Sequence, residues 1–202
     1  MAKMHFKYST MNSGKSIDLM HTVFNYEENG FKALVMKPEK DTKAGSKISS
    51  RIGLEREVDV LIGENDSIYD LLIGSTDVNA IFVDEAQFLT PNQVDELFNY
   101  TKALNTPVIC YGLRLNFKGE LFPGSKKLME VCEELEELPT LCSCGEIARY
   151  AGRKVNGKYR LTGEEVVIDG TANVEYKPLC GTCFLKKVKR VDLSGIRRYI
   201  SK

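Results

Sequence analysis

Eight residues near the N-terminus have the residue types and spacing of a phosphate-binding loop. Ser9-Thr10-Met11-Asn12-Ser13-Gly14-Lys15-Ser16 matches the pattern Gly-x-x-x-x-Gly-Lys-Ser/Thr except at its first position, where serine replaces glycine. In such a loop, backbone N–H groups and a helix N-terminus face phosphate oxygens, the lysine reaches the transferred group, and the last hydroxyl binds Mg²⁺. We therefore predict that Ser9, Thr10, Met11, Asn12, Ser13, Gly14, Lys15 and Ser16 bind ATP.

An ordinary helix start is the alternative interpretation of this segment, because serine and glycine are common in N-caps and turns. The surroundings favour the phosphate-binding loop. His5 to Ser9 is predicted to form a short strand before it, and Lys15 to Asn29 a helix after it. Phosphate binding requires this order of strand, tight loop and helix.

An acidic pair follows an apolar run in the middle of the chain. Ala80 to Asp84 is predicted to be a buried strand, and Asp84-Glu85-Ala86-Gln87 lies at its carboxyl end, where open α/β sheets bind ligands. We predict that these four residues belong to the ATP site and that Asp84, like Ser16, binds Mg²⁺. Glu85 is the predicted catalytic base for an attacking hydroxyl; its alternative role is to orient a water for ATP hydrolysis. A solvated turn is the simpler alternative for the whole segment.

Four cysteines form two close pairs in the last third of the chain. Cys142-x-Cys144 and Cys180-x-x-Cys183 supply four thiolates, which suit a closed tetrahedral Zn²⁺ site with a structural role. Free thiols or a redox couple are the alternative, but no thioredoxin-like strand and helix surround either pair. Cys110 and Cys132 fall within predicted elements and are expected to be buried apolar residues.

The first 138 residues alternate between strand and helix patterns. Further strands are predicted at Phe31 to Lys37 and Pro107 to Leu113. Further helices are predicted at Pro91 to Leu104, with Thr90 as N-cap, and at Ser125 to Leu138. This alternation predicts an α/β fold with a mostly parallel sheet.

The pattern changes at Pro139. We predict two domains, a P-loop ATP-binding α/β domain at 1–138 and a small zinc-stapled domain with a C-terminal tail at 139–202. A short strand is expected at Val166 to Ile168 within the second domain.

Composition limits the classes of function. The chain has 202 residues, of which 43% are hydrophobic, and its 28 basic residues balance 28 acidic ones. A neutral chain has no general attraction for nucleic acid, so a small substrate is expected, with no nucleic-acid and no membrane partner. Because no apolar run has the length of a signal peptide or membrane helix, the expected location is the cytoplasm.

Taken together, these segments resemble the thymidine kinases that join a P-loop core to a zinc-bearing lasso domain. The resemblance covers nearly the whole chain and is closest to the bacterial branch that lacks the first loop glycine. Its motifs are Tyr8 to Ser16, Ser50 to Leu54, Asp84 to Leu89 and Cys110 to Arg114. It implies a P-loop, RecA-like, mostly parallel sheet with helices on both faces, plus a small C-terminal zinc-ribbon-like lasso domain that acts as a lid.

The resemblance also implies an activity. ATP would donate its γ-phosphate to the 5′-hydroxyl of deoxythymidine, giving dTMP and ADP for DNA synthesis, with Glu85 as the base and a homotetramer as the assembly. Asp41 would reach Mg²⁺ through water. The implied thymidine contacts are Met11, Phe88, Leu113, Phe117, Val166, Val167, Ile168, Asp169, Gly170 and Tyr176.

Two positions depart from the family pattern, and one other function fits the motifs. Lys43 stands where many members have arginine, and Ala151 replaces a frequent threonine near the base. The alternative function is a small P-loop ATPase zinc module that acts on nucleic acid. Larger nucleic-acid motors need two ATP-binding lobes, and this chain has room for one.

Overall fold

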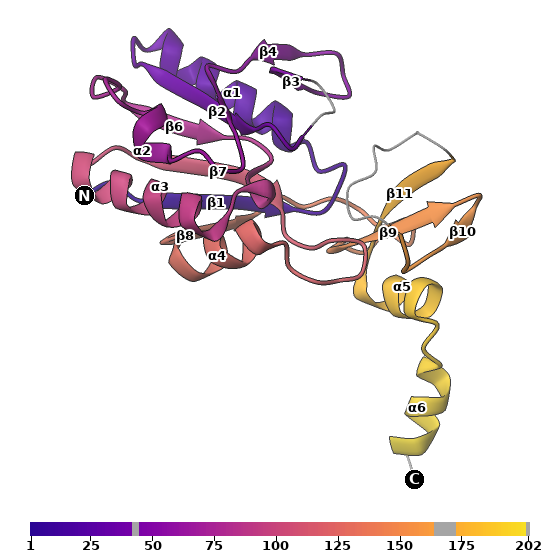
Figure 1. Ribbon diagram of the computed structural model, residues 1–202. Helices are drawn as coiled ribbons and strands as arrows, with labels where there is room; N and C mark the ends of the chain where they lie inside the picture. Colours follow the sequence, from indigo (N-terminus) through magenta and orange to yellow (C-terminus); the bar gives the residue numbers. More distant parts are fainter. Residues whose placement is uncertain (42–44, 164–172, 201–202) are drawn as a thin grey trace. The chain divides into compact units, whose positions relative to one another are not determined.

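The computed structural model describes residues 1–41, 45–163 and 173–200, which form two compact units (Figure 1). The first unit comprises Met1–Ser9, Ser13–Arg114 and Leu121–Leu138. The second comprises Thr10–Asn12, Leu115–Glu120 and Pro139–Lys202. Two short segments from the first 138 residues thus group with the C-terminal part. Val166 to Ile168, where a strand is predicted, lies outside the described residues.

The first unit is built on a six-stranded parallel sheet with the order β5-β2-β6-β7-β1-β8. Its strands are β1 (Met4–Ser9), β2 (Ala33–Pro38), β5 (Val60–Ile62), β6 (Ala80–Val83), β7 (Val108–Leu113) and β8 (Glu134–Glu137). Its helices are α1 (Lys15–Glu28), α2 (Ile68–Leu71), the 3-10 turn η1 (Ala86–Phe88), α3 (Pro91–Leu104) and α4 (Pro123–Val131). A hairpin of β3 (Lys47–Ser49) and β4 (Glu55–Glu57) pairs apart from this sheet. The predicted α/β fold class is confirmed.

Both faces of this sheet are buried, which explains the continuous apolar runs of its strands. In β6, Ala80 and Phe82 pack on the α1 side, whereas Ile81 and Val83 pack on the side of α2, α3 and α4. All four side chains are 0% exposed. The predicted layers of helices on both faces are therefore confirmed.

The helices around the predicted site begin where the sequence indicates. Thr90 Oγ1 accepts a hydrogen bond from Gln93 N at 3.2 Å, and Gln93 Oε1 accepts one from Thr90 N at 3.0 Å, which is a complete capping box for α3. In α1 the buried apolar residues are Leu19 and Val23. The same helix leaves Phe24 55% exposed.

One predicted helix is wrong in its second half. Ser125 to Leu138 is not a single helix, because α4 ends at Val131 and β8 follows as an edge strand parallel to β1. Cys132 leaves the helical region with φ −66° and ψ 137°. Leu138 N then donates to Tyr8 O at 2.8 Å. Pairing with the open edge of β1 outweighs the helix propensity of this glutamate-rich run.

The second unit contains a three-stranded antiparallel sheet with the order β10-β9-β11. Its elements are β9 (Tyr150–Val155), β10 (Lys158–Tyr159), β11 (Val174–Leu179), α5 (Gly181–Phe184), the π-helical turn η2 (Leu185–Lys189) and α6 (Leu193–Ile200). Its small core includes a stacked pair, Tyr150 and Phe184, with ring centroids 4.6 Å apart. Across the described ranges, no helix combines the length and apolar character that crossing a bilayer would need.

The N-terminus of α4 packs against the backbone of η1. A Cβ on Gly124 would lie 2.6 Å from Leu89 O and 2.8 Å from both Ala86 O and Gln87 O. These three acceptors are main-chain atoms and cannot rotate away. Only glycine therefore fits between the first turn of α4 and the segment that follows β6.

We expect Gly124→Ala to lower the free energy of unfolding by about 1–3 kcal/mol, because the added methyl group overpacks rigid backbone. Urea unfolding followed by circular dichroism measures this change. Lys126→Ala, on an exposed position of the same helix, is the control and should change stability by less than about 0.5 kcal/mol. Equal stability of Gly124→Ala and the unaltered chain would contradict the close packing.

Candidate active site

The predicted phosphate-binding loop connects β1 to α1, as the motif requires. Asn12 and Gly14 both have positive φ, 68° and 83°, and turn the chain sharply before the helix. Gly14 O accepts the first helical hydrogen bonds, from Ile17 N and Asp18 N, both at 3.0 Å. Lys15 opens the helix and is only 9% exposed. The predicted strand, loop and helix are confirmed, and the first N–H groups of α1 are available to an anion.

Several hydroxyls of the loop are shielded from solvent. Among the described residues, Ser9 Oγ, Thr10 Oγ1 and Ser13 Oγ have no hydrogen-bond partner. A buried hydroxyl without a partner carries a desolvation cost of roughly 1–3 kcal/mol. Phosphate oxygens would accept these O–H groups, so the hydroxyls suit the predicted ligand.

Asp84 is the most perturbed carboxylate of the site. It follows β6 directly and is 3% exposed, and its Oδ1 has no hydrogen-bond partner in the described part of the chain. Burial, together with the negative charge of Glu85, raises the pKa of Asp84 to about 7, whereas Lys15 opposes this shift. A buried acceptor beside a second carboxylate suits a divalent cation, which would supply the missing positive charge.

Asp41 lies close enough to Asp84 for its charge to raise that pKa further. Its own carboxylate is paired with the ammonium group of Lys37 at 2.7 Å. Lys37 is 1% exposed and also donates to Gly45 O and Lys47 O, at 3.2 and 3.0 Å. This buried lysine thereby ties the segment after β2 to the β3–β4 hairpin. Lys43, in the same segment, lies outside the described residues.

Glu85 occupies a strained turn between β6 and η1. Its φ of 47° and ψ of 37° place a non-glycine residue in the left-handed region, which costs of order 1–3 kcal/mol. Gln87, a predicted ATP contact, is 1% exposed. Its side chain binds Glu85 and the N–H of Leu113 instead of pointing to solvent. Backbone strain of this kind is typical of functional sites.

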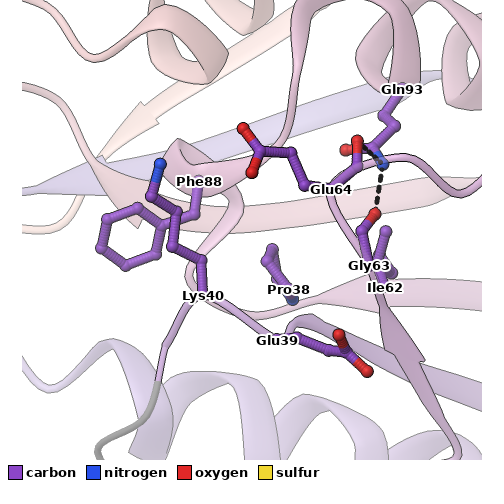
Figure 2. Close-up of a pocket in the computed structure, with 8 residues that line it drawn as sticks. All are labelled: Pro38, Glu39, Lys40, Ile62, Gly63, Glu64, Phe88 and Gln93. Carbon is purple, nitrogen blue, oxygen red and sulfur yellow. Dashed lines mark hydrogen bonds between the residues drawn. The ribbon is translucent and has the colours of Figure 1, made fainter.

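Phe88, a predicted thymidine contact, packs edge-on against Phe122, with ring centroids 5.9 Å apart. It also borders a pocket of about 300 Å³ at the ends of β2 and β5 (Figure 2). The pocket is lined by Pro38, Glu39, Lys40, Ile62, Gly63, Glu64, Phe88 and Gln93. Phe88 is the sole member of this set that the sequence predicts as a ligand contact.

Three other predicted thymidine contacts gather in the second unit. Phe117, Tyr176 and Met11 come from distant parts of the chain and share one apolar cluster with Val174 and Val155. Phe117 and Tyr176 are 2% and 7% exposed. Of the remaining predicted contacts, Leu113 is the last residue of β7 in the first unit, whereas Val166, Val167, Ile168, Asp169 and Gly170 lie outside the described residues.

No motif in the sequence indicates a role for Arg153. This residue of β9 lies opposite Tyr176 and is 7% exposed, with its guanidinium carbon 5.2 Å from the centroid of the Phe117 ring. Its Nη1 donates to Thr162 O at 2.6 Å. An arginine within a short polar strand gives no signal by itself, and only the register of β9 and β11 places it beside this cluster. Ala151, the departure from the family pattern, is buried two residues earlier in the same strand.

The four paired cysteines come together, as their spacing predicts. The Sγ atoms of Cys142, Cys144, Cys180 and Cys183 all lie within 4.8 Å of one another. Tetrahedral Zn²⁺ with Zn–S bonds of about 2.3 Å needs sulfurs about 3.8 Å apart. Two separate redox pairs would not require all four sulfurs to converge, so the cluster is a candidate metal site.

The other two cysteines belong to the first unit, and the expectation of burial is confirmed for Cys110 alone, because Cys132 is only partly buried. Cys110 is fully buried in β7, and Cys132 packs against the same core. Burial raises the pKa of both thiols, that of Cys132 to about 12. Both therefore stay protonated and act as apolar residues.

Comparisons with known proteins agree with this geometry. The family model described as "Thymidine kinase" matches residues 2–184. The chain belongs to the thymidine kinase family. A thymidine kinase of Rhodopirellula baltica is 42% identical over 93% of this chain and 90% of its own length. Those of Ruegeria pomeroyi and Yersinia pseudotuberculosis are each 40% identical, over 89% and 94% of this chain and 92% and 97% of their own lengths.

Family membership decides between the two functions that the motifs allow. The family and the curated relatives are kinases, which argues against a small ATPase module that acts on nucleic acid. The match includes the P-loop, the Asp84-Glu85 pair and all four clustered cysteines.

We expect Asp84→Asn to stabilise the metal-free protein at high pH. The pKa of Asp84 is raised on folding, so the carboxylate destabilises the native state increasingly as pH rises from about 4 to about 7. Urea unfolding in magnesium-free buffer should therefore show a gain for the asparagine variant that is larger at pH 8 than at pH 5 by a few kcal/mol. Exposed Asp70→Asn is the control. A gain independent of pH would contradict the assignment.

Proposed function

We propose that this chain transfers the γ-phosphate of ATP to the 5′-hydroxyl of thymidine, giving dTMP and ADP. The observation that carries the proposal is the convergence of Lys15, Asp84 and Glu85 in a chain that the thymidine kinase family matches over residues 2–184. Lys15 and Glu85 lie close enough to Asp84 for their charges to shift its pKa. A phosphate-binding lysine, a metal-binding aspartate and a base are the parts that phosphoryl transfer needs.

Each residue of this group has a role in the proposed reaction. Lys15 and the backbone N–H groups at the start of α1 hold the phosphates of ATP in line with the nucleoside. Ser16 and Asp84 would hold Mg²⁺, with Asp41 acting through water. When bound, Mg²⁺ neutralises charge on the phosphates. Glu85 accepts the proton from the 5′-hydroxyl as it attacks.

Thymidine contacts are proposed in each unit by the family resemblance. In the first unit they are Phe88 and Leu113, and in the second Met11, Phe117 and Tyr176, together with Val166 to Gly170. The apolar cluster of the second unit supports the latter set, since aromatic and aliphatic walls suit a planar pyrimidine. A cytoplasmic location and a homotetrameric assembly remain predictions.

We further propose that the metal of the Cys142, Cys144, Cys180 and Cys183 cluster is Zn²⁺ with a structural role. Four sulfurs complete a tetrahedron, so no ligand position is left for a substrate or water. The core around the cluster, which includes Leu179 and Phe184, is small, and a bound metal would supply stability that it lacks.

The activity is tested with a panel of nucleosides, ATP and Mg²⁺, by chromatography of the monophosphates formed. We expect dTMP to form, and Glu85→Gln to lower kcat by about 10²–10⁴-fold, because the general base is lost. Glu28→Gln, on an exposed position of α1, should retain the full rate. ATP hydrolysis stimulated by DNA, without any nucleoside phosphorylation, would contradict the proposal.

Removal of one metal ligand tests the proposed zinc site. We expect Cys183→Ser to lose the bound zinc and to unfold the second unit, because three thiolates hold the metal weakly. Metal analysis and near-ultraviolet circular dichroism measure the two effects. Cys132→Ala, outside the cluster, should keep one zinc ion per chain. A Cys183→Ser variant with full zinc content would contradict the assignment of Cys183 as a zinc ligand.

A further inference from the structure

Gln87 makes two hydrogen bonds inside the first unit. Its Oε1 accepts from Leu113 N at 2.9 Å, and its Nε2 donates to Glu85 Oε2. A backbone N–H can only donate, so it must face the amide oxygen of Gln87. The NH₂ group is then left to face the carboxylate, and both ends of the amide are satisfied. The orientation of this buried side chain is therefore determined by its two neighbours.

The main chain of β7 is shaped to admit the Gln87 amide. A Cβ on Gly112 would lie 2.9 Å from Gln87 Oε1 and 3.1 Å from Gln87 N, so a larger residue would displace the glutamine. The next residue, Leu113, is held from the other side, because its carbonyl accepts a 2.6 Å hydrogen bond from Ser125 Oγ. Ser125 is 0% exposed in the first turn of α4. The amide oxygen of Gln87 thus binds a backbone N–H, that of Leu113, whose own position is fixed by Ser125.

Glu85 needs such support more than an ordinary glutamate does. It is half-buried in a left-handed turn, and in the described part of the first unit its carboxylate accepts a hydrogen bond from Gln87 alone. A free glutamate side chain has several rotamers, and displacement of a catalytic group by about 1 Å can cost roughly 10²-fold in rate.

We propose that Gln87 is a positioning residue for phosphoryl transfer, which holds the Glu85 carboxylate at a set distance from the backbone of Leu113. This inference rests on the proposed function, in which Glu85 is the base. Leu113 is a proposed thymidine contact, so the amide links the group that removes the proton to a segment that contacts the nucleoside. The second oxygen of Glu85 is left for the 5′-hydroxyl.

The chain contains a natural control for a buried glutamine. Gln93 is the one other glutamine in the sequence and is 3% exposed. Its amide donates to Gly63 O at 2.8 Å (Figure 2). Its oxygen completes the capping box of α3. Gln93 binds backbone groups and no carboxylate, so its loss should affect stability without affecting the base.

The test compares Gln87→Met and Gln93→Met, since methionine matches glutamine in size and cannot make these hydrogen bonds. For Gln87→Met we expect kcat to fall by about 10–100-fold, with the KM values for thymidine and ATP changed less than about threefold. For Gln93→Met we expect a lower unfolding temperature and kcat within about twofold of the unaltered enzyme. Equal kcat values in the two variants would overturn the proposal.

A double-mutant cycle with Glu85→Gln separates positioning from general damage. If Gln87 acts through Glu85, adding Gln87→Met to the Glu85→Gln variant should lower kcat by less than about twofold. Additive losses would overturn the role of Gln87 and leave the proposed base intact. A full rate in Glu85→Gln alone would overturn the base itself and, with it, the role of Gln87.

Gln87→Glu keeps an acceptor for Leu113 N but removes the donor to Glu85. A purely structural role at Leu113 would therefore be rescued by this substitution, whereas positioning of the base would not. We expect a loss of kcat at least as large as that of Gln87→Met, measured on protein with native circular dichroism. Recovery of the unaltered rate would overturn the proposal.

Discussion

The buried carboxylate of Asp84 is the constraint on which the active edge of the first unit depends. Burial makes its ionised form costly, and the neighbouring negative charge of Glu85 adds to the cost. Because β6 is buried on both faces, the Asp84 carboxylate that follows it is also shielded from water. Lys15 at the start of α1 offsets part of that charge, and a cation would offset the rest. The lysine of the proposed phosphate-binding loop therefore offsets part of the electrostatic cost of burying Asp84.

The turn after Asp84 is held from several sides. Glu85 adopts a strained left-handed backbone conformation. Along the chain it lies between the apolar strand β6 and helix α3, which begins at a complete capping box. Gly124 lets the start of α4 approach the carbonyls of η1, and Gly112 leaves space for the Gln87 amide. This close packing keeps Glu85 in its strained left-handed conformation, because a relaxed backbone there would break the contacts at Gly124 and Gly112.

The two units are stabilised by different means. The first has a large core on both faces of a parallel sheet. The second has a small core beside the cysteine cluster and a separate apolar cluster that contains Phe117 and Tyr176. A domain with so little buried apolar surface gains much of its stability from a metal, so zinc binding and folding should be coupled there. Substitutions in the two units should therefore reduce activity for unrelated physical reasons.

The sequence alone determined the features that are local in the chain. The strand, loop and helix around Lys15, the capping box at Thr90 and the two cysteine pairs all follow from short-range spacing. Tertiary structure decided whatever depends on distant partners: β8 became a strand because β1 offered an open edge, and Met11 joined an apolar cluster of residues far from it in the chain. It also turned Gln87 toward the Glu85 carboxylate, because that contact needs the backbone of β7 beside the glutamine. The periodicity of a single segment does not predict such contacts, because they stabilise the protein only after the sheet has brought distant residues together.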